Sequence, residues 1–305
     1  MNYKMVGFVL GRIFLIEAAL MLFPMGCAAI YGEWSVVLSF LWPTLIVLAL
    51  GLITSLRTPQ NTKIYARDGL AIVALVWVLM SVFGALPFVI SGEIPSFVDA
   101  FFETVSGFTT TGSTILTDVE ALSHGTLFWR SFSHWIGGMG VLVFAMAVLP
   151  MTDGRAMHLM RAEVPGPTVG KISSKLSDSA KILYAIYFAM TLIEVILLCA
   201  GGMPLFDSLI HSFGTAGTGG FSNKGLSVGA YNNPYFEIVI GVFMLLFGIN
   251  FNVYYFILIG KGAQALKGEE FRAYIGMVIA GTLMIALNIL PLYGNSFAEA
   301  LHRAW

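Results

Sequence analysis

Asp99-Ala-Phe-Phe-Glu-Thr-Val-Ser-Gly-Phe-Thr-Thr-Thr-Gly112 is a short polar, glycine-rich stretch in an otherwise apolar sequence. A second stretch, Asp207-Ser-Leu-Ile-His-Ser-Phe-Gly-Thr-Ala-Gly-Thr-Gly-Gly220, repeats its pattern at a constant offset of 108 residues without a gap. Each copy follows one long apolar segment and precedes another. The sequence therefore contains, twice, an apolar segment, a short amphipathic segment, a Thr/Gly segment and a further apolar segment.

The composition is that of a membrane protein. Of the 305 residues, 57% are hydrophobic and 11% are charged, and the mean hydropathy is +0.84, which excludes an ordinary soluble domain. A helix needs about 20 apolar residues to cross a bilayer. Seven runs approach or exceed that length, near residues 5–30, 35–56, 69–91, 126–150, 181–202, 235–260 and 273–292. The sequence predicts an all-α, multi-pass integral membrane protein, and the first run lacks a small-residue cleavage site, so we expect it to be retained.

The charged residues are distributed unevenly among the connecting loops. Lys and Arg gather in the loops 57–68, 151–181 and 261–272, whereas the segment 91–125 carries five acidic residues and no basic one. Basic loops of membrane proteins remain in the cytoplasm. This rule places the N-terminus in the cytoplasm and both Thr/Gly segments on the outer side.

The two repeats lie in segments that are too apolar for ordinary loops and too short to span a bilayer, which is typical of re-entrant helices. Ser96-x-x-Asp99 resembles a capping box, and Pro204-x-x-Asp207 combines a first-turn proline with the same acidic position. We expect the short helices to stop at Ser106-Gly107 and at Gly214, after which the chain turns back as a Thr/Gly strand.

Such a strand exposes a row of carbonyl oxygens. Non-helical backbone at membrane depth is tolerated only where it is buried in protein or lines a water-filled cavity. Carbonyl oxygens can replace the hydration shell of a potassium ion, and glycine permits the backbone angles that align them. The sequence therefore predicts potassium-binding filter residues at Thr110, Thr111, Gly112, Thr218, Gly219 and Gly220.

Two other interpretations of these segments carry less weight. A single Thr/Gly run is usually a turn, but two copies at one offset, both facing outward, favour a filter. A phosphate-binding loop at 214–220 needs a Lys-Ser/Thr ending on a soluble strand-to-helix unit, whereas Phe221-Ser222 follows here within membrane sequence.

Several other polar residues are ambiguous in the sequence. Glu194 lies in the middle of a predicted span, where an ionisable group is costly; it either attracts cations or forms a contact between helices. Arg130 and His134 are expected to snorkel at the outer end of the fourth span. His211 is expected to pack on the second short helix, and Asn250 and Asn252 to link helices. We expect a negative outer face formed by Asp99, Glu103, Asp118, Glu120 and Asp207. It either attracts cations or consists of helix caps at Asp99 and Asp207 and a solvated surface elsewhere, and the two roles are compatible.

At this point the residues resemble a known family. The motifs are Gly84-Ala-Leu-Pro87, Phe101-Phe102-Glu103, Gly107-Phe-Thr-Thr-Thr-Gly112, Gly137-Gly-Met-Gly140, Arg161-Ala-Glu-Val-Pro-Gly-Pro167, Gly219-Gly-Phe-Ser222 and Glu270-Phe-Arg272. Together they resemble the Trk/Ktr/HKT superfamily of potassium transporters, and most closely its bacterial TrkH/TrkG branch. The resemblance covers essentially the whole chain.

The resemblance implies four helix–pore helix–helix units around one pore, preceded by two extra helices. It divides this chain into the extra helices at 1–60, a first unit at 61–155, a second unit at 156–265 and the start of a third at 266–305. Arg303-Ala304-Trp305 resembles Asp99-Ala100-Phe101, so we expect the chain to be a fragment that stops within the third unit. A fragment with two of four filter segments is not expected to conduct potassium alone.

The resemblance also implies function and partners. It implies potassium uptake across the bacterial inner membrane, regulation by cytosolic nucleotide-binding subunits of the TrkA type, and a homodimer embedded in membrane lipids. It implies potassium as the transported ion, no covalent cofactor, no enzymatic activity and no nucleic-acid partner. The basic loop 151–181 also suits anionic lipid headgroups, and the sequence does not separate these two partners.

A coupled symporter of potassium with sodium or protons is the alternative function. Alternating-access symporters are often built from inverted repeats, whereas the offset here encloses two spans and returns to the same side of the membrane, so the repeats are parallel. This favours a channel-like pore. A membrane enzyme is a third possibility, but the sequence has no metal-binding His/Glu pattern and no Ser/His/Asp set at a common depth.

Overall fold

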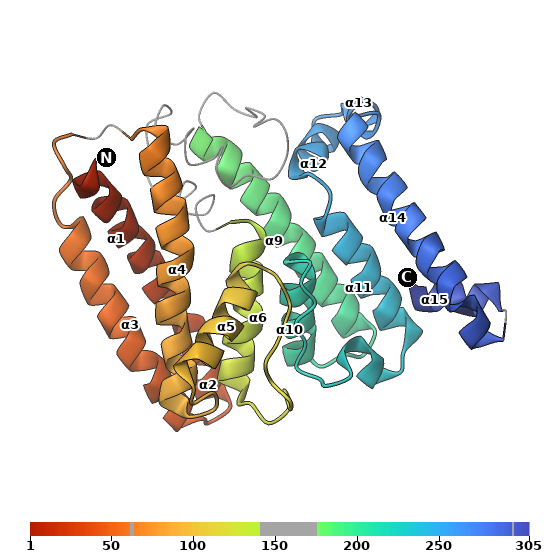
Figure 1. Cartoon of the computed structure of the whole chain (residues 1–305), viewed down its shortest axis with the longest axis horizontal. Helices are drawn as coiled ribbons and strands as arrows, with labels where there is room; N and C mark the ends of the chain where they lie inside the picture. The colour runs from red at the N-terminus through yellow and green to blue at the C-terminus, as the bar shows by residue number, and fades with distance from the viewer. Residues whose placement is uncertain (62–63, 141–175, 295, 305) are drawn as a thin grey trace. The chain divides into compact units, whose positions relative to one another are not determined.

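The computed structural model describes residues 1–61, 64–140, 176–294 and 296–304. Within these ranges the chain is helical and contains no β-strand (Figure 1), which confirms the all-α class. The chain divides into two compact units, Met1–Phe247 and Gly248–Trp305, which are taken in turn below.

The first unit begins with three helices, α1 (Tyr3–Leu20), α2 (Leu22–Ile30) and α3 (Trp34–Ser55). The run predicted at 5–30 is therefore divided at Met21. Helices α1 and α3 lie side by side (Figure 1), and glycine makes this close approach possible. A Cβ on Gly11 would overlap the Thr54 side chain, and one on Gly51 would lie 3.0 Å from the Gly11 carbonyl oxygen.

The first repeat consists of α4 (Ala66–Ser91), α5 (Phe97–Phe108) and α6 (His124–Gly138). The Ser96 hydroxyl accepts a hydrogen bond from the Asp99 N–H at 3.4 Å, and the Ser123 hydroxyl caps α6 in the same way. Trp129 of α6 is fully buried and donates its indole N–H to the Gly84 carbonyl at 2.9 Å. This bond ties α6 to α4.

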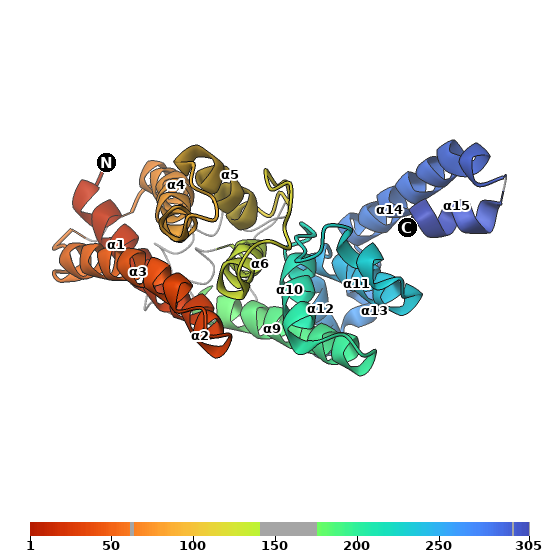
Figure 2. The same ribbon diagram turned by 90° about the horizontal axis from the view of Figure 1, so that it is seen from below.

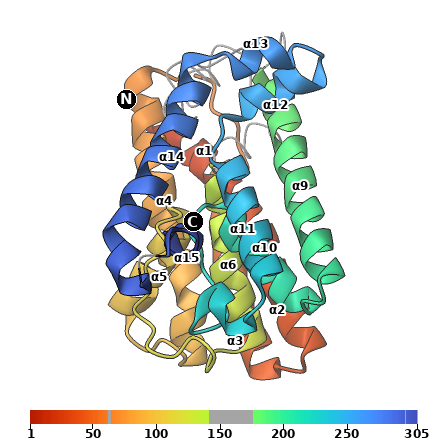
Figure 3. The same ribbon diagram turned by 90° about the vertical axis from the view of Figure 1, so that its right-hand side faces the viewer.

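The second repeat consists of α9 (Leu176–Ala200), α10 (Leu205–Ala216) and α11 (Pro234–Phe247), with a 3₁₀ turn η1 (Ser227–Tyr231) before α11. Helix α10 contacts both α9 and α11, and Figure 3 shows it between them. Helix α6 of the first repeat contacts both α5 and α10, and it lies between them in Figures 1 and 2. Helix α6 therefore joins the two repeats within this unit.

The predicted spans are recovered where the structure describes them. Five segments are long and apolar enough to cross a membrane: Tyr3–Ile30, Trp34–Ser55, Arg67–Ser91, Ala180–Ala200 and Glu269–Tyr293. A sixth is added if α11 and α12 (Phe251–Leu258) together form one span. Residues 141–150 of the predicted fourth span, most of the loop 151–181 and the motif Arg161–Pro167 lie outside the described residues. The chain is thus a multi-pass membrane protein.

The second unit contains α12, α13 (Gly262–Leu266), α14 (Glu269–Ile289), the 3₁₀ turn η2 (Leu290–Tyr293) and α15 (Phe297–Ala304). Asn250 caps α12, and its side-chain amide donates to Glu270 of α14 at 3.1 Å. This contact is of the helix-linking kind expected for Asn250.

The start of α15 corrects the predicted register of the third unit. Pairing Arg303 with Asp99 implies that this helix starts near residue 301, but it starts at Phe297. The match of Ser296 and Glu299 to Ser96 and Asp99 agrees with the observed start, because Phe297 then corresponds to Phe97, the first residue of α5.

Candidate ion-binding site

The two short helices match residue for residue at the offset of 108. Helix α5 runs from Phe97 to Phe108 and α10 from Leu205 to Ala216, so α5 continues one residue beyond its predicted stop at Ser106-Gly107 and α10 continues two beyond Gly214. The backbone bonds that end them also correspond. In the first copy the bonds run from Thr109 N–H to Val105 C=O (2.8 Å), from Thr110 N–H to Gly107 C=O (3.0 Å) and from Thr111 N–H to Ser106 C=O (2.9 Å). In the second copy they run from Gly217 N–H to Phe213 C=O (3.2 Å), from Thr218 N–H to Thr215 C=O (2.8 Å) and from Gly219 N–H to Gly214 C=O (3.2 Å).

The Thr/Gly segments share an unusual backbone conformation. Thr110 and Thr218 have φ of 54° and 55°, and Gly112 and Gly220 have φ of 75° and 76°. A β-branched residue with positive φ is a strong outlier, and such conformations cluster at functional sites. The predicted extended strand is therefore replaced by an irregular backbone in which left-handed residues alternate with others. We call residues 109–113 and 217–221 the filter segments.

The two filter segments touch each other. A Cβ on Gly112 would overlap the Gly219 carbonyl oxygen, and a Cβ on Gly219 would lie 2.9 Å from the Thr110 carbonyl oxygen. Glycine is needed at both positions because any side chain there would displace backbone, which cannot rotate away. Gly112 and Gly219, 107 positions apart in the chain, are thus in direct contact.

The six predicted filter residues keep their carbonyl oxygens free. Within the part of the chain that the structure describes, none of the carbonyls of Thr110, Thr111, Gly112, Thr218, Gly219 and Gly220 accepts a hydrogen bond. These residues are half-buried to exposed, whereas residues 103, 104, 106–108 and 211–216 of the supporting helices are buried. Free carbonyls on a buried support are the arrangement that can bind a partly dehydrated monovalent cation.

An ion pair behind the filter segments was missed by the sequence interpretation. Arg130 of α6 and Glu103 of α5 are 3% and 1% exposed, and the Arg130 Nε donates to a Glu103 carboxylate oxygen at 2.5 Å. Arg130 therefore does not snorkel, and Glu103 is not part of the outer face. The prediction failed because the helix positions alone do not show that α5 and α6 turn these residues toward each other.

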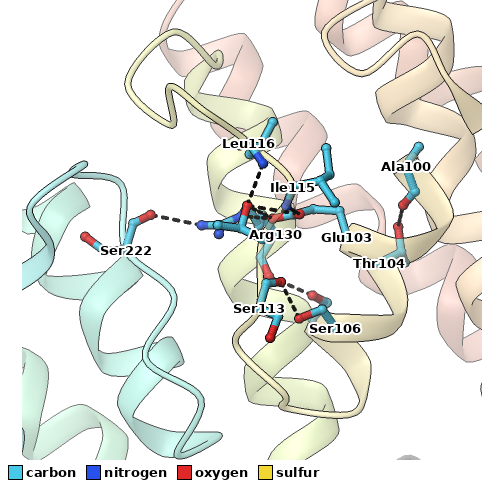
Figure 4. Close-up of polar contacts among 11 residues, drawn as sticks. Ala100, Glu103, Thr104, Ser106, Ser113, Ile115, Leu116, Arg130 and Ser222 are labelled. Atoms are coloured by element: carbon cyan, nitrogen blue, oxygen red, sulfur yellow. Dashed lines mark hydrogen bonds and ion pairs between the residues drawn. The ribbon is translucent and has the colours of Figure 1, made fainter. Parts of the chain in front are cut away.

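This ion pair reaches the chain that follows each filter segment. Glu103 accepts hydrogen bonds from the Thr114 hydroxyl at 2.9 Å and the Ile115 N–H at 3.1 Å. Arg130 Nη1 donates to the Ser222 carbonyl at 2.9 Å, and Figure 4 shows Arg130 between Glu103 and Ser222. The guanidinium also lies over the Phe221 ring, 3.5 Å from its centroid.

His134 lies one helical turn after Arg130 and is also wholly buried, which corrects its predicted snorkelling. Its ring lies 4.0 Å from the centroid of Phe221. A Cβ on Gly219 would overlap the His134 ring. His134 therefore packs directly behind the second filter segment. The i, i+4 spacing of Arg130 and His134 on α6 is the signal in the sequence that could have placed both on one face.

The loops that follow the filter segments carry further anchors. Asp207 accepts hydrogen bonds from the Asn223 amide and the Tyr231 hydroxyl, both at 2.7 Å, so it holds the chain after the second filter segment as well as occupying the first turn of α10. Burial, and then the hydrogen bond to Asp207, raise the pKa of Tyr231. Glu120 accepts hydrogen bonds from the Gly225 N–H at 3.2 Å and from Lys224 Nζ at 3.3 Å, and these bonds, the backbone one foremost, lower its pKa.

The remaining candidates occupy other places. Glu194 is wholly buried in α9. His211 is buried in α10 and meets the Tyr231 ring edge-to-face at 5.4 Å, in line with the packing role predicted for it. Cys27 and Cys199 are free thiols. No cluster of His, Cys, Asp and Glu able to hold a metal ion occurs among the described residues, so the candidate cation ligands are backbone oxygens.

Comparison with known proteins agrees with this architecture. A sequence profile of the TrkH family, described as "Cation transport protein", matches residues 35–281. The chain is 34% identical to the Trk system potassium uptake protein TrkH of Salmonella typhimurium over 308 residues, covering 99% of this chain and 62% of that protein. It is 33% identical to TrkG of Escherichia coli over 292 residues, covering 95% and 59%.

The fold comparison gives the same result. The crystal structure of the potassium transporter TrkH from Vibrio parahaemolyticus matches with a TM-score of 0.83 and 29% identity, covering 100% of this chain and 63% of that one. The chain thus spans somewhat less than two thirds of the length of these relatives. The profile match extends over most of the sequence and includes both filter segments, so the chain belongs to the TrkH family of cation transport proteins.

Proposed function

We propose that this chain forms part of a channel-like pore for potassium uptake across the bacterial inner membrane. The observation that carries the proposal is the pair of filter segments, which share one backbone conformation and touch at Gly112 and Gly219. They present six carbonyl oxygens that accept no hydrogen bond from the described residues. The transport of potassium by the relatives supports the choice of ion.

The chemistry of the filter explains a preference for potassium. A cation entering the filter exchanges water oxygens for carbonyl oxygens. The free energy gained from the carbonyl oxygens nearly offsets the free energy of losing water only for an ion that fits the spacing and number of these oxygens. The backbone N–H groups of Thr111 and Gly219 donate hydrogen bonds to carbonyls of α5 and α10, and these bonds hold both residues against the supporting helices. The Thr110 and Gly219 carbonyls, from different repeats, then contribute to one binding region, and further segments would complete it.

The assembly around the pore follows from the family. We propose the unit boundaries 1–60, 61–155, 156–265 and 266–305, a cytoplasmic N-terminus, and a homodimer embedded in membrane lipids. We further propose that cytosolic nucleotide-binding subunits of the TrkA type regulate the pore from the side of the basic loops. Potassium is the transported ion, bound only in passage.

Potassium uptake in a host strain without its own potassium transporters tests the function, using the transporter as its own gene encodes it. Gly112→Ser and Gly220→Ser should each lower potassium selectivity over sodium by about tenfold or more, since about 1.4 kcal/mol of differential binding is a factor of ten. In Gly112→Ser the hydroxymethyl group would stand at the Gly219 carbonyl oxygen, whereas in Gly220→Ser it would meet only Met244, 3.9 Å away, and would act by straining the filter backbone at a φ of 76°.

Gly92→Ser is the matched control. Gly92 has φ of 78°, almost that of Gly112, but a Cβ there would meet nothing within 4 Å. It should carry the same backbone strain and keep wild-type selectivity. Equal loss in all three variants would overturn the filter assignment.

Potassium influx that stops when the proton and sodium gradients are both collapsed, with the potassium gradient kept, would favour the coupled symporter over the pore.

A further inference from the structure

The chain after each filter segment leads to the same buried ion pair. We propose that Glu103 and Arg130 form a two-sided tether that positions both filter segments and thereby sets ion selectivity. This inference rests on the proposed function of the filter segments and adds two positioning residues that contact the chain beside the filter rather than the ion.

Glu103 holds the first filter segment at its exit. Its carboxylate accepts hydrogen bonds from the Thr114 hydroxyl and the Ile115 N–H, which follow Gly112 by two and three residues. The Ser106 hydroxyl adds a bond to the Ser113 carbonyl at 2.6 Å. The chain leaving Gly112 is thus attached to helix α5 at successive residues.

Arg130 holds the second filter segment at the equivalent place. Its Nη1 donates to the carbonyl of Ser222, two residues after Gly220, and its guanidinium lies over the ring of Phe221. The Ser222 contact is to backbone, so it positions the main chain itself. A planar guanidinium can bond a carboxylate with one edge, a carbonyl with another and stack with its face.

The ion pair is buried away from water, and the second repeat has no equivalent pair. Both side chains are nearly fully buried, where a charge is tolerated only if it is paired and hydrogen-bonded. The position of Glu103 in the second repeat, at the offset of 108, is His211. Glu103 and Arg130 both belong to the first repeat, and Arg130 reaches into the second.

Removal of this tether should lower ion selectivity more than it lowers the stability of the fold. A buried ion pair is weak evidence for stability, since an apolar pair of similar volume often stabilises as well or better. The tether nonetheless fixes the backbone of two segments that touch at Gly112 and Gly219. Its removal should let the carbonyl oxygens separate or rotate, and the filter should then discriminate less between ions of different size.

The test is the potassium-to-sodium selectivity of the complete transporter carrying Glu103→Gln with Arg130→Met. The double substitution removes both charges together, so no unpaired charge remains, and it removes the bond to Ser222. We expect the protein to reach the membrane in near wild-type amount and the selectivity ratio to fall about tenfold or more, where tenfold corresponds to about 1.4 kcal/mol. Unchanged selectivity in a folded double variant would overturn the tether.

The pair Glu120–Lys224 supplies the matched control. It also joins the chain after the first filter segment to the chain after the second, but Glu120 is half exposed and Lys224 a third exposed. Exposed ion pairs contribute little. Glu120→Gln with Lys224→Met should therefore lower the ratio much less than the buried-pair variant does, and a fall equal to that of the buried pair would mean that any link between these two stretches of chain suffices, against the tether.

Phe221→Leu covers the case in which the double variant does not fold. It keeps the ion pair and most of the apolar volume but removes the ring beneath the guanidinium. A smaller fall of the ratio in the same direction supports the tether, and wild-type selectivity opposes it. If the unmodified transporter shows no potassium selectivity at all, the proposed function fails instead, so the two failures are distinguishable.

Discussion

At the scale of single residues, several polar side chains of the described chain are paired with elements that are distant in sequence. Glu33, between α2 and α3, illustrates this at the outer end of α6. It accepts hydrogen bonds from the His124 N–H at 2.8 Å, the His124 ring at 2.9 Å and the Gly125 N–H at 3.0 Å. The Tyr31 ring stacks on His124 with centroids 3.7 Å apart. Glu33 thus caps a helix that is distant in sequence, in the place where an anion is stabilised by the helix N-terminus.

The acid stability of the protein should depend on Glu33. Burial raises the pKa of this carboxyl, but the hydrogen bonds from Gly125 and His124 outweigh it and leave the pKa below its ordinary value. A lowered folded-state pKa stabilises the fold above the unfolded-state pKa, and this contribution is lost as the pH falls through the folded-state pKa. Glu33→Gln should lower thermal stability at neutral pH, by about 1 kcal/mol as for a lost helix cap, and much less at acidic pH.

Detergent-solubilised protein scanned by thermal unfolding from neutral to acidic pH would measure this difference. Glu269→Gln is a suitable control, since Glu269 is an exposed acid in the first turn of its own helix α14. A stability difference between wild type and Glu33→Gln that does not shrink on acidification would contradict the prediction.

At the scale of elements, close helix packing and capping position the filter segments. The first-turn contacts of α5 and α6 follow from short-range sequence signals, whereas the glycine contact between α1 and α3 joins residues 40 positions apart and appears only in the structure. The division of the first apolar run at Met21 and the break between α11 and α12 at Gly248–Asn250 do not show in hydropathy. Hydropathy averages over a window, and a break of one to three residues leaves the average unchanged.

The contact between α1 and α3 gives a prediction at this scale. Gly11→Ala would place a methyl group against Thr54 and 3.2 Å from the Gly51 carbonyl. Overpacking a tight contact destabilises by about 1–3 kcal/mol, although alanine has the better helix propensity. Gly7→Ala, one turn earlier on the same helix, meets nothing within 4 Å and should be neutral or slightly stabilising. Thermal unfolding of the two variants in one detergent compares them directly, and equal effects would refute the packing argument.

At the scale of the whole molecule, topology and charge distribution assign the two sides of the membrane. The loops 57–68 and 261–272 are basic and the segment 91–125 is acidic, so we propose from the positive-inside rule that both filter segments face outward.

Cysteine accessibility in intact cells measures this orientation. In a background in which Cys27 and Cys199 are replaced by alanine, Asp118→Cys should react with a membrane-impermeant maleimide added outside. Lys267→Cys should react only after the cells are permeabilised. Labelling of Lys267→Cys in intact cells at the rate of Asp118→Cys would reverse or refute the topology.

The sequence by itself determined the helical class, the membrane location, the two-fold repeat and the six filter residues proposed here. These features follow from local properties: run length, charge counts and a constant offset. The tertiary structure alone decided that the filter segments touch at Gly112 and Gly219 and that Glu103 and Arg130 are buried together behind them. The physical reason is that the rotation of each helix about its axis follows from packing against all of its neighbours. The sequence around Arg130 does not distinguish a side chain that faces water from one that pairs with a buried residue 27 positions away.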